Sequence, residues 1–320
     1  MAAMWLLLPV LLLLDHNVAW SLSRSASVQP VSSNSTLTGE ELLRIGEIHD
    51  HQLHFRETLT YYELALSTFR EKKQTRGIAI ALVKIARVYE RQGKIHDAYT
   101  AVQEAVSLLA KSSDKLSYAQ ALSVMGRISA RLGDQEEART SLSQAIALFN
   151  RLKDRRGWNE ASIQLGLLQV REDFPEQGLS LLQQAKEDAR AREDHSQHLA
   201  ALMALGTAHW LLDQPQDARR FYETALQLAE AERNMPLEAT LRLRLAYFEG
   251  EDGQLSEGAE SAKHALFLSQ TLHDAEIEAA ATSLLADLYR KMGRMTEAEE
   301  SEQRALSMYR HRQIYIHGIQ

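Results

Sequence analysis

Residues 85–105 read IARVYERQGKIHDAYTAVQEA, and the final alanine of this segment belongs to a column that recurs every 40 residues. The column consists of Ala65, Ala105, Ala145, Ala185, Ala225, Ala265 and Ala305. A fixed period of roughly 20 to 50 residues is typical of a solenoid, in which similar supersecondary units stack and bury their faces on one another. The period therefore predicts a repeat protein rather than a fold built around one compact core.

Two further columns of small residues keep the same phase. The column nineteen residues before the alanines holds Gly46, Ala86, Gly126, Gly166, Gly206, Ala246 and Ala286. The column seven residues before them holds Thr58, Ala98, Ala138, Gly178, Ala218, Gly258 and Ala298. Small residues let two helix backbones approach closely, and a large aliphatic residue ahead of each first-column position fills the adjoining space. Each repeat is therefore expected to contain two packed helices.

Turn and cap residues mark where these helices begin and end. Glycines such as Gly93 and Gly133 follow the first small column by seven residues, and Pro175 and Pro215 suit the first turn of a helix. Good N-cap residues share one column between repeats, namely Asp114, Asp154, Asp194, Asn234 and Asp274. We expect two helices of about 16 to 18 residues per repeat, and no strand pattern follows residue 38.

The segment Ile85-Ala86-x-x-Tyr89-x-x-x-Gly93-x-Ile95-x-x-Ala98 resembles the tetratricopeptide repeat. The resemblance covers residues 39 to about 310 and implies an all-α, right-handed superhelical solenoid of about seven helix-turn-helix repeats. The 40-residue period exceeds the usual 34 of the family, and leucines such as Leu82 replace its early Trp. The long period resembles that of scaffold and regulator proteins that bind peptides inside their superhelix, which implies a protein-binding role.

Composition is ordinary for a globular protein, with 45% hydrophobic and 25% charged residues. The formal net charge of −7 gives no basic excess to support nucleic-acid binding. The sequence has no Cys, which excludes disulfides and thiolate zinc sites. The unbroken period favours one elongated domain over residues 39–310, followed by an apolar tail over residues 311–320.

The N-terminal residues 1–21 are expected to form a signal peptide. The apolar run Trp5–Leu14 is too short to span a membrane but fits the hydrophobic region of a secretory leader. Cleavage after Ser21 would leave residues 22–38 as a flexible Ser-rich linker that carries a glycosylation sequon at Asn34. We therefore expect export to the periplasm or outside the cell, with no stable membrane span. An uncleaved interfacial anchor or a misassigned start is the alternative.

No motif of an enzyme or a metal site emerges. His49, His51 and His54 lie on the first predicted helix, but their spacing puts no single helix face under all three rings. Partly exposed structural histidines are the expectation there. We predict no catalytic residues, no metal and no cofactor.

Basic residues recur on the first helix of repeats 2 to 4. By resemblance to the family, this helix lines the concave surface, and each pair at spacing i, i+4 shares one face. The arginines predicted to bind a partner are Arg87, Arg91, Arg127, Arg131 and Arg171. Arg guanidinium groups suit carboxylates, which predicts a ligand with an acidic segment. Alternatively, acids such as Glu90 neutralise these arginines in ordinary ion pairs.

The same face becomes apolar in repeats 4 to 6. Its residues are Ile163, Leu167, Val170, Met203, Trp210, Leu211, Leu243 and Tyr247. An exposed apolar strip with aromatic residues is typical of a partner site, so Leu167, Trp210, Leu211 and Tyr247 are added to the predicted binding residues. The alternative is that some of these side chains simply pack between adjacent helices.

Two functions follow from these observations. The first is a non-catalytic scaffold or adaptor that binds an acidic-hydrophobic peptide or a partner protein in its groove. The second is a regulatory or assembly subunit whose groove or apolar C-terminal tail mediates oligomerisation, including homo-oligomerisation, because a solenoid end needs a cap.

Overall fold

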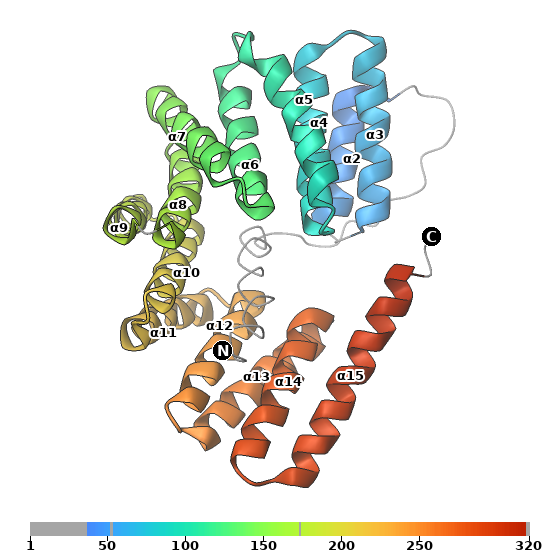
Figure 1. Cartoon of the computed structure of the whole chain (residues 1–320). Coiled ribbons are helices and arrows are strands. Elements are labelled where there is room, and N and C mark those ends of the chain that lie inside the picture. Colours follow the sequence, from blue (N-terminus) through green and yellow to red (C-terminus); the bar gives the residue numbers. More distant parts are fainter. Residues whose placement is uncertain (1–36, 52–53, 173, 318–320) are drawn as a thin grey trace. The chain divides into compact units, whose positions relative to one another are not determined.

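The computed structural model describes residues 37–51, 54–172 and 174–317, and every regular element within these ranges is an α-helix (Figure 1). This confirms the all-α repeat fold. The chain divides into two compact units at residues 192 and 193. In the first unit lie α2 (Gly39–His51), α3 (Phe55–Glu71), α4 (Thr75–Arg91), α5 (Ile95–Ala110), α6 (Lys115–Leu132), α7 (Gln135–Leu152), α8 (Arg155–Arg171) and α9 (Pro175–Ala191).

The second unit continues the same alternation. It contains α10 (His195–Leu211), α11 (Pro215–Ala231), α12 (Met235–Glu251), α13 (Leu255–Leu272), α14 (Ala275–Lys291) and α15 (Met295–His317). Even-numbered helices are the first helices of the repeats and odd-numbered ones are the second. Every extensive helix contact joins helices that are adjacent or next but one along the chain, as expected of a solenoid, whose repeats contact only their neighbours.

Helix ends follow a 20-residue rhythm. Gly93 and Gly133 have positive φ angles of 77° and 85°, as the sequence predicts for the turn inside a repeat. At the end of α4, Gly93 N–H donates to the Glu90 carbonyl and Lys94 N–H to the Tyr89 carbonyl, which forms a Schellman motif. Lys73 and Lys153, in the turns between repeats, also adopt the left-handed backbone conformation, with φ of 53° and 58°.

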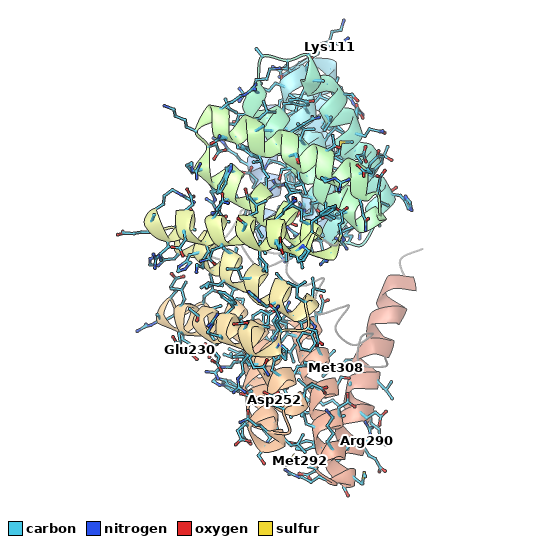
Figure 2. The ribbon with its side chains drawn as sticks, turned by 60° about the vertical axis from the view of Figure 1, so that its left-hand side comes forward. Lys111, Glu230, Asp252, Arg290, Met292 and Met308 are labelled. Carbon is cyan, nitrogen blue, oxygen red and sulfur yellow. The ribbon has the colours of Figure 1, made fainter. Side chains whose placement is uncertain are left out.

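The N-cap column performs its predicted role. The carboxylates of Asp114 and Asp154 each accept a hydrogen bond from the backbone N–H three residues later, at 3.0 Å. Asn234 and Asp274 make the equivalent contact at 3.3 and 3.1 Å. Each such cap stabilises its helix by roughly 0.5–2 kcal/mol. Long polar side chains such as Lys111, at the end of α5, and Arg290, in the last turn of α14, extend near the turns (Figure 2).

The small columns lie where helices touch. The alanines of the 40-residue column are fully buried, except that Ala305 is 5% exposed. Gly166 in α8 and Gly178 in α9 approach so closely that a Cβ on Gly178 would lie 2.5 Å from the Gly166 carbonyl oxygen. No larger residue fits there without moving the two helices apart.

A large side chain of the second helix fills the space that the first small column leaves. A Cβ added to Gly46 would lie 2.4 Å from the Tyr62 ring, and one added to Gly206 would lie 2.7 Å from the Tyr222 ring. Where the first small column holds the larger alanine, the second helix carries a smaller side chain: the positions equivalent to Gly46 and Tyr62 are Ala86 and Val102 in the next repeat. Volume is thus balanced between the two helices in these three repeats, which a close-packed core requires.

The predicted terminal segments lie partly or wholly outside the described residues. The signal peptide of residues 1–21 lies outside the described residues, as does all of the linker except residues 37 and 38. The tail of residues 311–320 begins inside α15, whose backbone is helical through His317. Within the described ranges, no helix combines the length and the apolar character needed to cross a membrane.

The column of buried alanines yields a stability prediction. Ala145→Leu adds three carbon atoms to a fully buried position, and such overpacking costs roughly 1–3 kcal/mol. Urea unfolding followed by circular dichroism should therefore show a lower midpoint for this variant. Ala147→Leu is the matched control, because Ala147 is exposed on the same helix and its midpoint should stay close to wild type. Equal midpoints for the two variants would contradict the packing described here.

Candidate partner-binding surface

The predicted arginines of repeats 2 and 3 lie on α4 and α6, which pack against one another in the first unit. We call the five basic side chains of this region the α4–α6 basic surface. It consists of Lys84, Arg87, Arg91, Arg127 and Arg131. The structure brings these residues together on neighbouring first helices, yet it gives them different surroundings.

Arg87 is the exposed member of this surface. Its side chain makes no hydrogen bond and no ion pair with any described residue. Burial, and then the charges of Asp50 and Glu47, raise the pKa of the Tyr62 hydroxyl, and the charge of Arg87 acts to lower it. Arg87 therefore has its forked set of donors available to a ligand.

Glu90, in contrast to Arg87, is buried and paired. This carboxylate is buried, at 3% exposure, and it accepts a 2.7 Å hydrogen bond from Arg127 of the next repeat. The Arg131 guanidinium lies 3.7 Å from its other oxygen. A buried carboxylate needs such compensation because desolvation of an unpaired charge is costly. Arg127 and Arg131 are thus held by Glu90, which is the ordinary ion pairing that the sequence left open.

Arg91 and Lys84 pair with the preceding repeat. Arg91 lies 2.8 Å from the Asp50 carboxylate and its guanidinium sits 4.7 Å from the centre of the Phe55 ring. Lys84 lies 2.7 Å from the Glu47 carboxylate, and both of these side chains are partly exposed. Three acids thus compensate four of the five cations, so the surface keeps a net positive charge.

A cation at one repeated position also binds the end of the previous first helix. Arg131 donates to the Glu90 carbonyl at 3.1 Å, and Lys291 lies 3.5 Å from the Gly250 carbonyl, each across 41 residues. The last carbonyls of a helix have no partner within the helix, and the dipole there attracts cations. Arg131 and Lys291 therefore have a structural role as well as a charge.

The remaining predicted residues of the first unit lie on α8. Arg171 is exposed in its last turn, whereas Leu167 is buried at 8% exposure. Ile163 and Val170 on the same helix are buried too. The apolar strip that the sequence predicts is therefore not an exposed surface in this part of the structure.

The second unit holds the predicted aromatic residues. The Trp210 ring packs edge-on against Tyr247 and Phe248, with centroid distances of 5.5 and 4.9 Å. Burial, and then the charge of Glu251, raise the pKa of the Tyr247 hydroxyl. Leu211 is 38% exposed beside this cluster, whereas Met203 and Leu243 are buried in the core. We call Trp210, Leu211 and Tyr247 the aromatic patch.

No group of three or more His, Asp or Glu side chains that could hold a metal ion occurs within residues 37–51, 54–172 and 174–317. His49 stacks on Tyr61 with ring centroids 5.3 Å apart, and its ring lies 6.0 Å from that of His54. The His49 ring of α2 thus contacts other rings.

Comparison with known structures identifies the same fold elsewhere. The chain is similar to the apo form of RapI, with 12% identity and a TM-score of 0.63 over 85% of this chain and 97% of that one. It is also similar to aspartyl phosphate phosphatase F from Bacillus subtilis, with 11% identity and a TM-score of 0.62 over 85% and 70%. The Rap conjugation gene regulator of plasmid pLS20, solved with the Phr* peptide, has 16% identity and a TM-score of 0.63 over 86% and 74%.

Comparison of the sequence points to one family. No curated protein matches the chain. Models of the tetratricopeptide repeat match residues 77–151, 159–231 and 281–314, which is more than half of the 320 residues. These segments include the helices that carry the α4–α6 basic surface. The chain belongs to the tetratricopeptide repeat family.

Proposed function

We propose that this protein is a non-catalytic scaffold that binds an acidic and hydrophobic segment of a partner protein on the first helices of its repeats. The observation that carries the proposal is Arg87, an exposed guanidinium without an ion pair amid cations that neighbouring acids hold in place. A ligand carboxylate would find a bidentate partner there at little cost in side-chain rearrangement. A structure of the same fold has been solved with a peptide, which supports this class of ligand.

The aromatic patch supplies the second half of the proposed interaction. Trp and Tyr side chains bury large areas at interfaces and dominate binding where they are partly exposed. Leu211 and the accessible part of Trp210 would contact the hydrophobic residues of the partner. The α4–α6 basic surface and the aromatic patch belong to different units.

Reversal of charge at Arg87 tests the first half. Full-length protein is used to capture partners from an extract of its source organism, and bound proteins are quantified by mass spectrometry. Arg87→Glu should reduce capture of the specific partner roughly ten-fold, the loss of a charge-assisted contact. The variant should fold normally, since Arg87 pairs with nothing in the described structure.

Arg156→Glu is the matched control for that experiment, because Arg156 is an exposed arginine of α8 outside the basic surface. Variants of Arg127 or Arg131 are less informative, since they would leave the buried Glu90 carboxylate without its partners. Equal loss with Arg156→Glu would indicate a general charge effect and contradict the assignment. Capture of the protein itself alone would favour the assembly-subunit function instead.

Leu211→Ser tests the aromatic patch. Its side chain is 38% exposed, so the substitution should change stability little and weaken partner capture several-fold through lost apolar contact. Leu152→Ser, at a leucine of α7 that is 44% exposed, is the control. Unchanged capture by Leu211→Ser would remove the aromatic patch from the proposed interface.

Export is the remaining proposal. The apolar run of residues 5–14 and the small residues before Leu22 motivate it. Protein secreted by the source organism should begin near Leu22 when its N-terminus is sequenced. A mature protein that still begins at residue 1 inside the cell would contradict it.

A further inference from the structure

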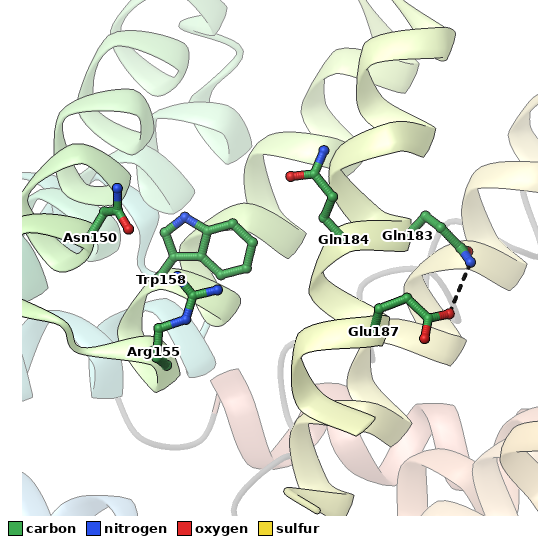
Figure 3. Close-up of a pocket in the computed structure, with 6 residues that line it drawn as sticks. All are labelled: Asn150, Arg155, Trp158, Gln183, Gln184 and Glu187. Atoms are coloured by element: carbon green, nitrogen blue, oxygen red, sulfur yellow. Dashed lines mark hydrogen bonds between the residues drawn. The ribbon is translucent and has the colours of Figure 1, made fainter. Parts of the chain in front are cut away.

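A polar hollow lies where three consecutive helices of the first unit meet. It has a volume of about 590 Å³ and is open to solvent. Its lining comes from the end of α7, the start of α8 and the middle of α9, and consists of Asn150, Arg155, Trp158, Gln183, Gln184 and Glu187 (Figure 3). None of these residues belongs to the α4–α6 basic surface or to the aromatic patch.

Two uncharged groups of this hollow are available. The Trp158 indole N–H and the Asn150 side-chain amide make no hydrogen bond with any described residue. Gln184 has only a 3.3 Å contact with the Ser180 hydroxyl. Figure 3 shows the six-membered ring of Trp158 on the side of Gln184 and its indole nitrogen on the side of Asn150. Gln183 donates to the Glu187 carboxylate at 3.2 Å. The hollow therefore combines an aromatic surface with two N–H donor groups, of Trp158 and Asn150, that have no partner among the described residues.

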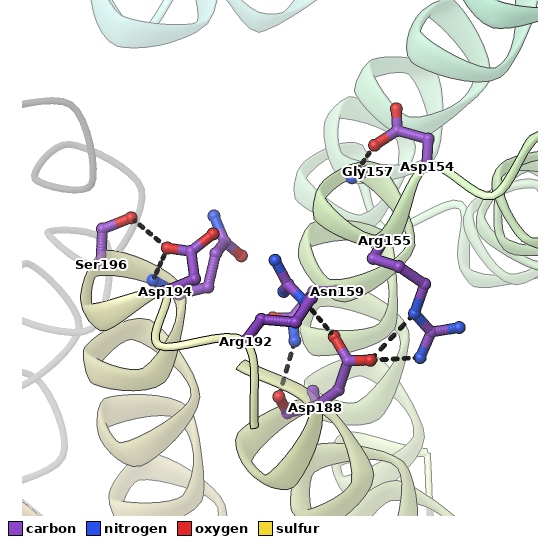
Figure 4. Close-up of polar contacts among 10 residues, drawn as sticks. Asp154, Arg155, Gly157, Asn159, Asp188, Arg192, Asp194 and Ser196 are labelled. Carbon is purple, nitrogen blue, oxygen red and sulfur yellow. Dashed lines mark hydrogen bonds and ion pairs between the residues drawn. The ribbon is translucent and has the colours of Figure 1, made fainter. Parts of the chain in front are cut away.

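The charged groups of the hollow are already paired. Arg155 Nε donates to Asp188 at 2.9 Å, and Arg192 Nε donates to the same carboxylate at 2.8 Å (Figure 4). Burial acts to raise the pKa of Asp188, but the hydrogen bonds from Arg155 and Arg192 and their charges outweigh it and hold that pKa below its usual range. Glu187 lies 2.9 Å from Arg190. A ligand of this hollow therefore needs no charge of its own.

Trp158 is held in place by this network. The Arg155 guanidinium sits 4.4 Å from the centre of the indole ring and is fixed by Asp188. One side of the ring packs on the core cluster that contains Phe149. An aromatic ring that is already ordered loses little entropy when it binds a ligand.

The repeat pattern does not require this arrangement. The position of Asp188 is a leucine in four other repeats, Leu108, Leu148, Leu228 and Leu268. Repeat 3 has only a weaker counterpart of the stacked pair, with Lys115 5.8 Å from the Tyr118 ring. A local departure from a pattern that otherwise serves packing is expected at functional sites.

We propose that this hollow binds an uncharged, proline-rich segment of another protein in the polyproline II conformation. In that conformation the backbone carbonyls have no internal partner, and proline removes the competing N–H donors. A proline ring would pack against Trp158, while successive carbonyls accept from the indole N–H and from the amides of Asn150 and Gln184. Aromatic-lined grooves with such donors are a recurring mode of recognition of extended proline-rich peptides.

The test uses the full chain, labelled with ¹⁵N at tryptophan, and a capped octaproline peptide as the probe. The indole N–H signal of Trp158, assigned by its absence in Trp158→Phe, should shift progressively and saturate as the peptide is added. The Trp210 signal should stay unchanged. A capped Gly-Ser peptide of equal length should shift neither signal, since its chain is flexible and lacks the ring.

Three variants make the test specific. Trp158→Phe keeps an aromatic ring but deletes the donor, and should weaken peptide binding by about three- to ten-fold, as measured by calorimetry. Gln184→Ala should weaken it about three-fold. Gln144→Ala is the matched control, since Gln144 occupies the same position one repeat earlier, outside the hollow, and should bind like wild type. Both glutamines are exposed, so folding is not at issue.

Several results would overturn the proposal. Absence of any Trp158 shift at millimolar octaproline is one, and equal weakening by Gln184→Ala and Gln144→Ala is another. A shift of the Trp158 signal by cellotetraose but not by the peptide would assign the hollow to a carbohydrate. Arg87→Glu should leave octaproline binding unchanged, so this test and that of the proposed function can fail independently.

Discussion

The close approach of two helix backbones at positions without a large side chain is the contact on which the structure depends. At Gly166 and Gly178 the backbones meet so directly that a methyl group would collide with a carbonyl oxygen. A buried alanine such as Ala145 plays the corresponding part where one repeat meets the next. This proximity allows a single large residue per repeat, such as Tyr62 or Leu182, to fill the remaining space. Because these contacts set the distances between helices, they also set the spacing of the charged side chains on the surface.

Equal spacing in the sequence does not give equal environments. Arg87 and Arg127 are 40 residues apart in the same column, yet one is exposed and the other is bonded to Glu90. The preceding repeats differ: Arg127 binds the buried Glu90, whereas the equivalent carboxylate before Arg87, Asp50, lies 2.8 Å from Arg91 instead. Of these two arginines, Arg87 alone offers its guanidinium to a ligand in the described part of the chain, so the column does not form a uniform ladder.

The architecture could be predicted from the sequence because a repeat presents the same evidence many times. The small columns, the turn glycines and the N-cap aspartates each depend on local geometry, and the structure confirms their positions. Left-handed residues such as Lys73 and Lys153 could not be recognised, since no glycine marks them and the turn is imposed by the packing of the helices that it joins.

Whether a predicted binding residue is exposed depends on the neighbouring repeats, and a single sequence column does not show this. Exposure of Arg87 and burial of Leu167 are decided by what the adjacent repeats contribute. The hollow beside Trp158 was missed for the same reason, because Asn150 and Gln184 are distant in the sequence and meet only when three helices pack. The one sign of the hollow in the sequence is Asp188, at a position that is leucine in four other repeats. The role of the predicted residues in binding stays a prediction.

The cation that reaches back across 41 residues has a consequence for how the chain is made. The Glu90 carbonyl in the last turn of α4 is exposed to water until Arg131, which belongs to the next repeat, has emerged from the ribosome. The end of α4 is therefore completed by the next repeat, and Lys291 does the same for the end of α12. The short sequence distance of these contacts also keeps the loss of chain entropy small at each step. A nascent chain that ends before Arg131 would therefore carry an α4 whose last turn is not yet completed.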